Sequence, residues 1–472
     1  MNRRDFLKTV GAGVTAAGLA RSGNLARAAG SQAEKKKPNF IFILTDDQRH
    51  DAIGCAGNPI IRTPNIDALA ARGVRFENAF VTLSICSPCR AACLTGRYGS
   101  TTGVTTVPGT LNKDEKTIAH LLKDSGYRTG VVGKWHLDNS PASLGFDYSP
   151  YFRSNGPYYN RKVIEQGGRT VAKGYIEDYN ADKAIDFLEE ATAGDSPFFL
   201  WLCTQVPHMN HEFDWPARDQ SLALYDDNDI PLPATWQETL KGKPPYLRDS
   251  RSRTRALEYG YDDPAKIRRH FKRYYAAITE MDAALGRVFD SVDKLGLRDN
   301  TYFLFMGDNG WFMGEHRFTS KVLAYEESIR VPMIVAGPGI SPAVNDHLVL
   351  NIDLPATILD LAGIPKPQNM HGAGLTPLLK ARSTQWRADF FYEAPTPTLG
   401  SHPIFAIRTH KYKYIQTRSP DDLSKIEFQE LYDLEADPTE TTNLAAKRQY
   451  ILIKENLRHR LDQARTAIAT RA

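Results

Sequence analysis

Residues 84–97 read Ser-Ile-Cys-Ser-Pro-Cys-Arg-Ala-Ala-Cys-Leu-Thr-Gly-Arg, and three of the five cysteines of the chain lie here, at positions 86, 89 and 93. A Cys-x-x-Cys spacing is typical of zinc and iron–sulfur ligands, but such sites use about four soft ligands. The other two cysteines, Cys55 and Cys203, are single, and the sequence holds no second Cys-x-x-Cys pair. The stretch therefore does not predict a zinc or iron–sulfur centre.

Five apolar runs on either side of this stretch predict buried β-strands. Four of the runs are almost continuously apolar, as expected for a strand that is covered on both faces, whereas the second also contains Arg128 and Thr129. The runs are residues 39–45, 127–132, 197–204, 301–306 and 331–336.

Helical patterns separate these runs. Thr63 and Pro64 suit the N-cap and first position of a helix that Gly73 ends. Further helices are expected at 116–124 and at about 265–295, the second continuous or with a break. The alternation of strand and helix predicts an α/β fold with a large, mixed, mainly parallel sheet flanked by helices.

Four of the five predicted strands end in polar residues, namely Asp46 and Asp47, Lys134 and His136, His208, and Asp308 and Asn309. The carboxyl ends of parallel strands form the ligand crevice of an open sheet. Asp, Asn, Lys and His often follow strands because they suit turns, and this explains one or two such ends. It does not explain why the four ends together supply one set of acidic residues and one set of basic residues. Three carboxylates and an amide suit a hard cation, Ca²⁺ or Mg²⁺, rather than zinc.

Two motifs carry a resemblance to a known family. Cys86-Ser87-Pro88-Cys89-Arg90 followed by Leu94-Thr95-Gly96-Arg97 resembles the signature of the formylglycine-dependent type I sulfatases, which belong to the alkaline-phosphatase-like superfamily. Residues 126–136 are similar to the second signature of that family. Two positions depart from the pattern: the family usually has Ala or Ser where this chain has Cys89, and a larger apolar residue in place of Cys93. The resemblance covers nearly the whole mature chain.

The resemblance implies that Cys86 is oxidised to formylglycine and that Ca²⁺, with Mg²⁺ as the alternative, is bound beside it. The implied metal ligands are Asp46, Asp47, the modified Cys86, Asp308 and Asn309. The implied catalytic residues are Cys86, Arg90, Lys134, His136, His208 and Lys321. Hydrated formylglycine would attack sulfur, His208 and Lys321 would protonate or steady the leaving oxygen, and His136 would assist release of sulfate.

The substrate is expected to be a sulfated glycan. Residues 315–321 and 325–332 resemble the corresponding segments of carbohydrate sulfatases, including those acting on 6-sulfated N-acetylglucosamine. His316 and Arg317 would contact sugar hydroxyls or carboxylates, or else only pack their loop. The irregular segment 209–263 is expected to form a substrate loop. The alternatives are an aryl or alkyl sulfatase, a phosphonate or phosphate ester hydrolase, and a non-catalytic glycan-binding protein whose Cys86 is never matured.

The N-terminus predicts export. Residues 1–28 contain Arg3-Arg4, a Gly/Ala-rich apolar stretch and the cleavage pattern Ala26-Arg27-Ala28, which together resemble a twin-arginine signal peptide. The apolar stretch is too short and too rich in glycine to span about 30 Å of hydrocarbon, so no stable membrane anchor is expected. We therefore expect a periplasmic or extracellular protein whose partners include the twin-arginine translocase and a formylglycine-generating maturation enzyme.

The rest of the chain is predicted to form a linker at 29–37, a catalytic domain at 38–380 and a small C-terminal α+β subdomain at 381–472. Alternating runs at 390–393, 404–408, 411–415 and 430–434 predict an antiparallel sheet, closed by a helix at about 448–466. The net charge is only +4, and no long basic run follows the linker. The composition gives no indication of nucleic-acid binding.

Overall fold

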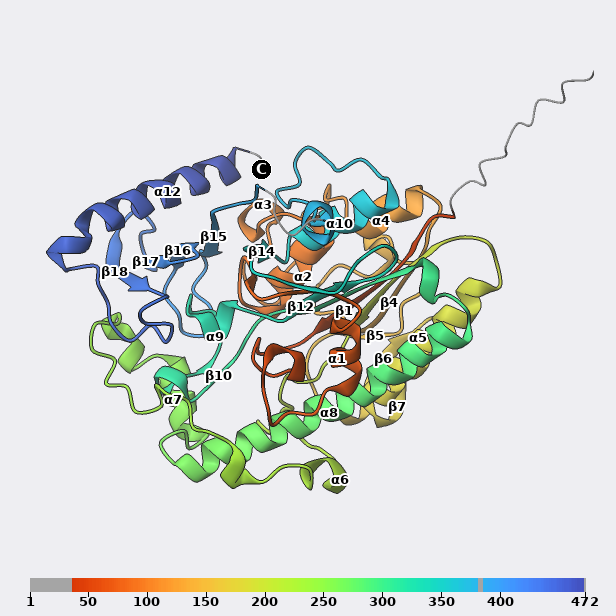
Figure 1. Ribbon diagram of the computed structural model, residues 1–472, viewed down its shortest axis with the longest axis horizontal. Helices are drawn as coiled ribbons and strands as arrows, with labels where there is room; N and C mark the ends of the chain where they lie inside the picture. The colour runs from red at the N-terminus through yellow and green to blue at the C-terminus, as the bar shows by residue number, and fades with distance from the viewer. Residues whose placement is uncertain (1–35, 381–384, 471–472) are drawn as a thin grey trace, which may run out of the picture. The chain divides into compact units, whose positions relative to one another are not determined.

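The first predicted strand, β1 (Asn39–Thr45), lies inside a ten-stranded sheet in the computed structural model, which describes residues 36–380 and 385–470 (Figure 1). All seven residues of β1 are buried, as the continuous apolar run predicts. The strand order is β13 (Ala343–Asn345), β2 (Gly73–Phe76), β12 (Met333–Ala336), β9 (Thr301–Gly307), β1, β8 (Phe198–Cys203), β4 (Arg128–Lys134), β5 (Tyr151–Phe152), β6 (Tyr159–Glu165) and β7 (Gly168–Tyr175).

The five predicted strands are neighbours at the centre of this sheet. β9, β1, β8 and β4 run parallel, whereas β12 is antiparallel to both β9 and β2. The sheet is therefore mixed and mainly parallel at its centre, which confirms the predicted fold class. The outer strands were not predicted, because β6 and β7 have mostly part-buried or exposed side chains and lack a continuous apolar run.

Helices cover both faces of the sheet (Figure 1). Ile41 and Ile43 of β1 face a core formed with α1 (Pro64–Ala70), α5 (Ile176–Thr192) and α8 (Pro264–Lys294). Phe40 and Phe42 face the opposite core, formed with α2 (Cys86–Thr95), α4 (Ile118–Asp124) and α10 (Asp353–Ala362). Alternation along β1 thus fills two separate cores, since successive side chains of a strand point to opposite faces.

One local prediction about the helices is confirmed and another is wrong. Thr63 is the N-cap residue of α1 and Pro64 is its first residue, although the Thr63 side chain makes no capping hydrogen bond: its Oγ1 accepts from Gly54 N at 2.8 Å and donates to Asp67 Oδ1 at 3.1 Å. Gly73 starts β2, and α1 ends three residues earlier. The long helix α8 is continuous over its 31 residues.

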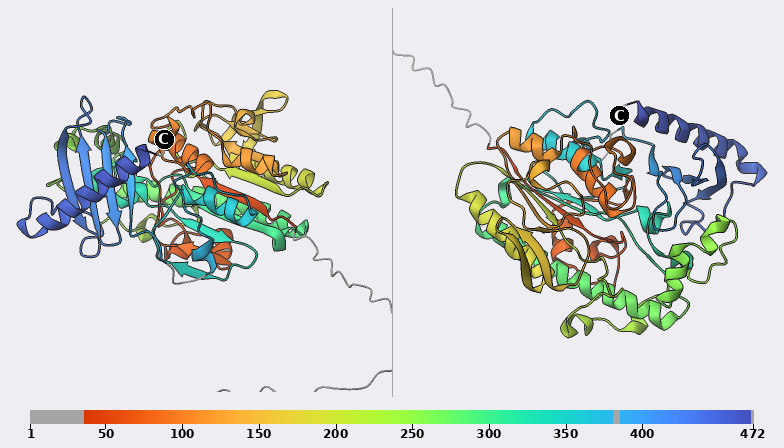
Figure 2. Two further views of the ribbon diagram at one scale, coloured as in Figure 1. Left: turned by 90° about the horizontal axis from the view of Figure 1, so that it is seen from above. Right: turned by 180° about the vertical axis from the view of Figure 1, so that it is seen from behind.

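A separate antiparallel sheet forms towards the C-terminus, as predicted. It consists of β15 (Asp389–Ala394), β16 (Ile404–Thr409), β17 (Tyr412–Arg418) and β18 (Ile426–Asp433) in that order. Helix α12 (Ile451–Ala469) packs across this sheet and buries Leu457 and Leu461 (Figure 2). Residues from Lys37 onwards form one compact unit.

The predicted signal peptide and nearly all of the predicted linker lie outside the described residues, as do residues 381–384 at the predicted domain boundary. Export by the twin-arginine route and the domain limits therefore stay predictions. None of the helices in residues 36–380 and 385–470 is both long and apolar enough to cross a membrane.

Candidate active site

The polar ends of β1, β9 and β4 meet at one edge of the sheet. Because these strands are parallel and close in the strand order, the residues that follow them come together. Asp46, Asp47, Cys86 and Asp308 each offer one ligand atom, and these atoms all lie within 4.8 Å of one another. We call the following residues the buried cluster, since each is at most 4% exposed: Asp46, Asp47, Cys86, Arg90, Lys134, Asp308, Asn309 and Lys321.

Cys86 is the first residue of α2 and faces the charged members of the buried cluster. Its Sγ donates to Asp46 Oδ1 at 3.4 Å and accepts from Lys321 Nζ at 3.1 Å and from Lys134 Nζ at 3.6 Å. Burial and the charge of Asp46 raise the pKa of the Cys86 thiol to about 12, although the two lysines oppose this shift. The unmodified side chain is therefore a neutral thiol at physiological pH, and a poor nucleophile.

Arg90 lies one helical turn after Cys86 and joins three parts of the buried cluster. Its Nη1 donates to Lys134 O at 2.6 Å, and its Nη2 donates to Asp308 Oδ2 at 3.1 Å and lies 3.6 Å from Asp46 Oδ2. The guanidinium is fully buried, so these carboxylates are needed to stabilise its charge. Arg90 thereby ties the ends of β1, β4 and β9 to α2.

Lys321 reaches the buried cluster from the hairpin of β10 (Phe312–Met313) and β11 (Thr319–Ser320). Its ammonium contacts the Asp47 carboxylate, donates to Asn309 Oδ1 at 3.2 Å and lies 5.5 Å from the centroid of the Trp311 ring. Lys134 makes the matching contact with Asp46. Each of the two acidic residues after β1 is thus paired with one lysine.

The two predicted histidines flank the buried cluster. His208 Nδ1 lies 2.7 Å from Met209 O, and its Nε2 lies 3.5 Å from Asp47 Oδ2. Burial lowers the pKa of His208 although Asp47 opposes the shift. Burial and the charge of Lys134 lower the pKa of His136 to about 2, so this imidazole is neutral. In its neutral form, His208 would donate from Nδ1–H to the Met209 carbonyl and present Nε2 as an acceptor.

The acidic members of the buried cluster fit a hard divalent cation. Burial alone would raise the pKa of Asp46, but Lys134, His208 and Arg90 hold it well below its usual range. Burial and Asp46 raise the pKa of Asp308 to about 7. Asp47 Oδ2 is buried and accepts no hydrogen bond from the described residues. A cation would give these oxygens the partner that so close a set of carboxylates needs.

A cavity of about 320 Å³ opens above the buried cluster, with Cys86, His136, His208 and Lys321 among its lining residues. Its other side is formed by residues that we call the pocket wall: Asn155, Asn210, His211, Phe213, Arg251, Arg255, Tyr259, Trp311 and Leu399. These come from the predicted substrate loop 209–263, which contains the short helix α7 (Arg251–Glu258), and from elsewhere in the chain. Leu399 comes from the C-terminal subdomain.

Known proteins resemble this chain along most of its length. The family model "Sulfatase" matches residues 38–364, and the model "N-sulphoglucosamine sulphohydrolase, C-terminal" matches residues 314–467. The chain belongs to the sulfatase family. An N-acetylglucosamine-6-O-sulfatase of Bacteroides thetaiotaomicron is 30% identical to this sulfatase, and the match covers 93% of this chain and 88% of the relative.

Solved structures agree with this family. A protein in complex with its substrate D-glucosamine-2-N,6-O-disulfate has a TM-score of 0.83 at 28% identity, covering 92% of this chain and 99% of that chain. A phosphonate monoester hydrolase of Agrobacterium radiobacter shares the fold with a TM-score of 0.73 at 21% identity, covering 92% of this chain and 96% of that one. The chain is therefore a type I sulfatase of the alkaline-phosphatase-like superfamily and a sulfuric ester hydrolase.

The structure does not place His316 and Arg317 in the pocket of this sulfatase, so their prediction as substrate contacts is corrected. His316 is 0% exposed: its Nδ1 contacts Glu238, its Nε2 lies 3.7 Å from Glu327 Oε2, and its ring packs against Tyr325. Burial lowers the pKa of His316, but the two glutamates outweigh it and raise that pKa. Arg317 is half-buried, does not line the cavity and accepts a hydrogen bond on its carbonyl from Arg253 Nη1 at 3.2 Å.

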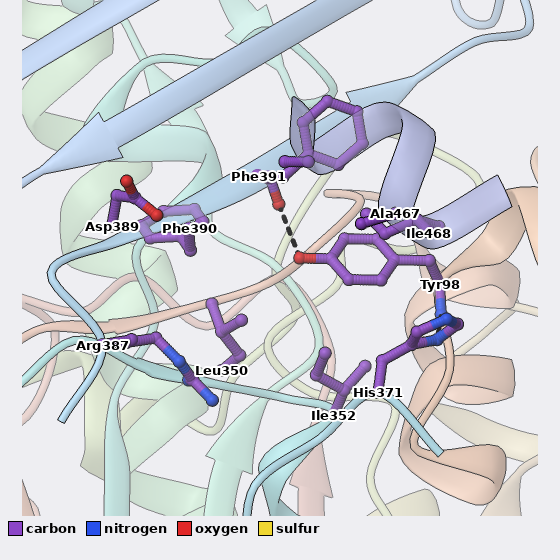
Figure 3. Close-up of a pocket in the computed structure, with 11 residues that line it drawn as sticks. Tyr98, Leu350, Ile352, His371, Arg387, Asp389, Phe390, Phe391, Ala467 and Ile468 are labelled. Carbon is purple, nitrogen blue, oxygen red and sulfur yellow. Dashed lines mark hydrogen bonds between the residues drawn. The ribbon is translucent and has the colours of Figure 1, made fainter. Parts of the chain in front are cut away.

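A second cavity of about 260 Å³ lies between α12, β15 and the segment around Tyr98 (Figure 3). Tyr98 donates from its hydroxyl to Phe391 O at 3.0 Å, and the ion pairs of Arg387 with Asp353 and of Arg460 with Asp389 lie in the same region. None of its lining residues belongs to the pocket wall or to the buried cluster. We assign it to the junction between the main sheet region and the C-terminal sheet.

Proposed function

We propose that this sulfatase removes sulfate from a sulfated glycan, with a nucleophile formed from Cys86 by oxidation to formylglycine and with Ca²⁺ bound beside it. The observation that carries the proposal is the position of Cys86 Sγ. It lines the pocket and lies within 3.4 Å of Asp46 Oδ1 and 3.1 Å of Lys321 Nζ. A nucleophile at this point would face both a carboxylate set and the cations that a sulfate group needs.

The proposed cation would be held by Asp46, Asp47, Asp308 and Asn309, and it would supply Lewis-acid stabilisation of the developing negative charge. Formylglycine, once hydrated, supplies two hydroxyl groups on one carbon, so one can attack sulfur and the other can later expel sulfate. Mg²⁺ is the alternative for the same oxygen ligands.

Residues of the chain would hold and release the sulfate ester. Lys321 and Lys134 present ammonium groups beside the nucleophilic position, and they stabilise negative charge on the sulfate oxygens. Arg90 holds Asp308 and Lys134 in place from behind. Lys321 would give the leaving oxygen a positive charge, and His208 would give it a proton when its Nε2, which faces Asp47, is protonated. His136 lines the same pocket and would assist the release of sulfate.

The pocket wall supports a glycan as the leaving group. Phe213, Tyr259 and Trp311 offer aromatic surface on which the apolar face of a sugar ring can pack, and Asn155 and Asn210 offer amide groups for hydroxyls. Two similar proteins support the same class: the N-acetylglucosamine-6-O-sulfatase, and the protein that was solved with its glucosamine disulfate substrate. A phosphonate ester is the second candidate, favoured only by the shared fold.

Peptide mass and a substrate panel test the proposal. The peptide of residues 76–90 should be about 18 Da lighter than its sequence mass, because formylglycine replaces the thiol by an aldehyde. The purified protein should then release sulfate from glucosamine 6-O-sulfate more efficiently than phenylphosphonate from its monoester. An unmodified Cys86 in fully active protein would overturn the nucleophile, and activity confined to aryl sulfates would overturn the glycan.

A further inference from the structure

Helix α7 directs two arginines at the pocket. Arg251 and Arg255 are four residues apart, so they lie on one face of the helix, and both line the cavity. Arg253 lies on another face: it is 9% exposed and donates to Arg317 O. The sequence Arg-x-Arg-x-Arg thus divides into one arginine that holds the helix in place and two that face the ligand space.

Both pocket-facing guanidinium groups can still bind an anion. Among the described residues, no hydrogen bond or ion pair engages the guanidinium of Arg251, and this residue is exposed. Arg255 Nη1 pairs with Glu258 Oε2 at 2.6 Å, and its guanidinium carbon lies 5.2 Å from the centroid of the Phe213 ring. That ion pair is largely exposed and therefore weak, and a guanidinium has five N–H donors.

The charge of the pocket has one sign. Its charged lining residues are Lys321, Arg251 and Arg255, and none of the described lining residues is Asp or Glu. The carboxylates of the buried cluster lie beneath and are already paired with Lys134, Lys321 and Arg90. A pocket lined by cations and open to solvent concentrates anions.

The start of α7 is fixed by the C-terminal subdomain. Gly400 has a φ of +78°, and a Cβ at this position would lie 2.7 Å from Arg251 Cβ. Its neighbour Leu399 lines the pocket. Ser250 caps α7 by accepting from Arg253 N at 3.3 Å. The backbone that carries Arg251 is therefore held from two sides, which favours a defined binding position over a mobile surface charge.

We propose that Arg251 and Arg255 form a subsite for a second oxyanion, a sulfate or a carboxylate, carried by the leaving group of the sulfate ester. Within the described part of the chain, neither guanidinium forms a hydrogen bond or ion pair with the buried cluster, so the two would not serve the sulfate that is cleaved. The inference rests on the proposed function, because it names the substrates of that same pocket: glycans with at least two anionic groups. Arginine suits this role because it binds planar oxyanions through paired hydrogen bonds.

Kinetics with matched saccharides test the subsite. The probes are glucosamine 6-O-sulfate, glucosamine 2-N,6-O-disulfate and a 6-O-sulfated glucosamine linked to a uronate. Wild-type kcat/KM should be higher for the two doubly charged probes. The double variant Arg251→Gln, Arg255→Gln should lower kcat/KM on them by about 10- to 100-fold and on the monosulfate by a much smaller factor. The second probe carries a second sulfate and the third carries a carboxylate, so the comparison of these two shows which oxyanion the subsite binds better.

Arg248→Gln is the matched control, since Arg248 is exposed, precedes α7 and does not line the cavity. It removes one positive charge by the same substitution, where the double variant removes two, and it should leave the preference between the probes unchanged. Equilibrium titration of the probes into a Cys86→Ala protein gives a readout that does not depend on maturation, and the double substitution in that background should weaken only binding of the doubly charged probes by about 10-fold or more.

Two results would overturn the subsite while leaving the proposed function intact: equal wild-type kcat/KM on all three saccharides, or equal losses on all three in the double variant. A general charge effect would appear as the same change of preference in Arg248→Gln and would also overturn it. Turnover of aryl sulfates with neither binding nor turnover of any saccharide would overturn the glycan proposal and the subsite together.

Discussion

The buried cluster and the pocket wall face the same cavity but are built in opposite ways. The buried cluster stands at the ends of parallel strands and at the start of α2, and every member is nearly inaccessible to solvent. The pocket wall comes from loops, from α7 and from the C-terminal subdomain, and it includes exposed residues such as Arg251 and Phe213. The chemistry is thus held rigidly, whereas recognition of the leaving group depends on segments with fewer constraints.

This difference teaches where variation can be tolerated. A charge in the buried cluster cannot be lost alone, because its partner would remain buried and unpaired. A change at an exposed member of the pocket wall such as Arg251 mainly alters contacts with solvent and ligand, so substrate preference can change without loss of the reaction.

Cys86→Ala should abolish sulfate release, by on the order of 10³-fold or more, because the proposed nucleophile is lost. The thermal midpoint should change little, since a small side chain replaces another at the start of α2. Sulfate release and thermal unfolding of the purified variant measure both effects. Retained activity would show that the buried cluster does not contain the nucleophile.

Chelation of divalent cations should lower activity by about 10²-fold or more, because a Lewis acid contributes several kcal/mol to such a transition state. Added Ca²⁺ or Mg²⁺ should restore it, whereas Asp47→Asn should not recover fully at any concentration tested. Elemental analysis of active protein provides the check. Stoichiometric zinc without Ca²⁺ or Mg²⁺ would contradict the proposed oxygen-ligand site.

His316→Ala should destabilise the fold by about 3 kcal/mol, because Glu238 and Glu327 would keep buried charge without the imidazole between them. The matched control His211→Ala removes an exposed imidazole from the pocket wall and should alter stability by less than about 0.5 kcal/mol. Denaturant unfolding of both variants gives the comparison. Equal stabilities would mean that His316 has no structural role.

Arg317→Ala should change kcat/KM on a saccharide and on an aryl sulfate by less than about 2-fold each. The side chain does not line the cavity, and the carbonyl that holds Arg253 belongs to the backbone and survives the substitution. Parallel kinetics on both substrates measure this. A selective loss on the saccharide would instead restore Arg317 as a substrate contact.

The central strands were predictable because their local sequence pattern matches the burial that the tertiary structure gives them. A strand buried on both faces favours a continuous apolar run, and the sequences of β1, β8, β9 and β12 have one, whereas β4 has only Val131 and Val132 between glycines. The direction of β12 was not predictable, since an apolar run reads the same whether its neighbours are parallel or antiparallel. β6 and β7 were not predicted because polar residues on their exposed faces interrupt the apolar pattern.

In the site, sequence motifs identified the residues of the buried cluster. Closeness along the chain to these residues did not identify the residues of the pocket wall. His316 lies only five residues before Lys321, yet neither His316 nor Arg317 lines the pocket, and both have left-handed backbone that spacing along the sequence does not predict. Arg251 and Leu399 are distant in the chain and meet only through the packing of Gly400 against α7. The four-residue spacing of Arg251 and Arg255 was the one local sequence signal for the pocket wall. It indicates a shared helix face only once α7 is known to lie beside the pocket.

The burial of α2 has a consequence for how active protein is made. All ten residues of α2 are buried, and Cys86 is 2% exposed. If Cys86 is the residue that is oxidised, a maturation enzyme must reach it before α2 packs, so oxidation and folding compete for the same nascent chain. A chain that folds first keeps its thiol out of reach. A preparation can then contain two species with one fold, and its specific activity depends on the conditions of synthesis as well as on the sequence.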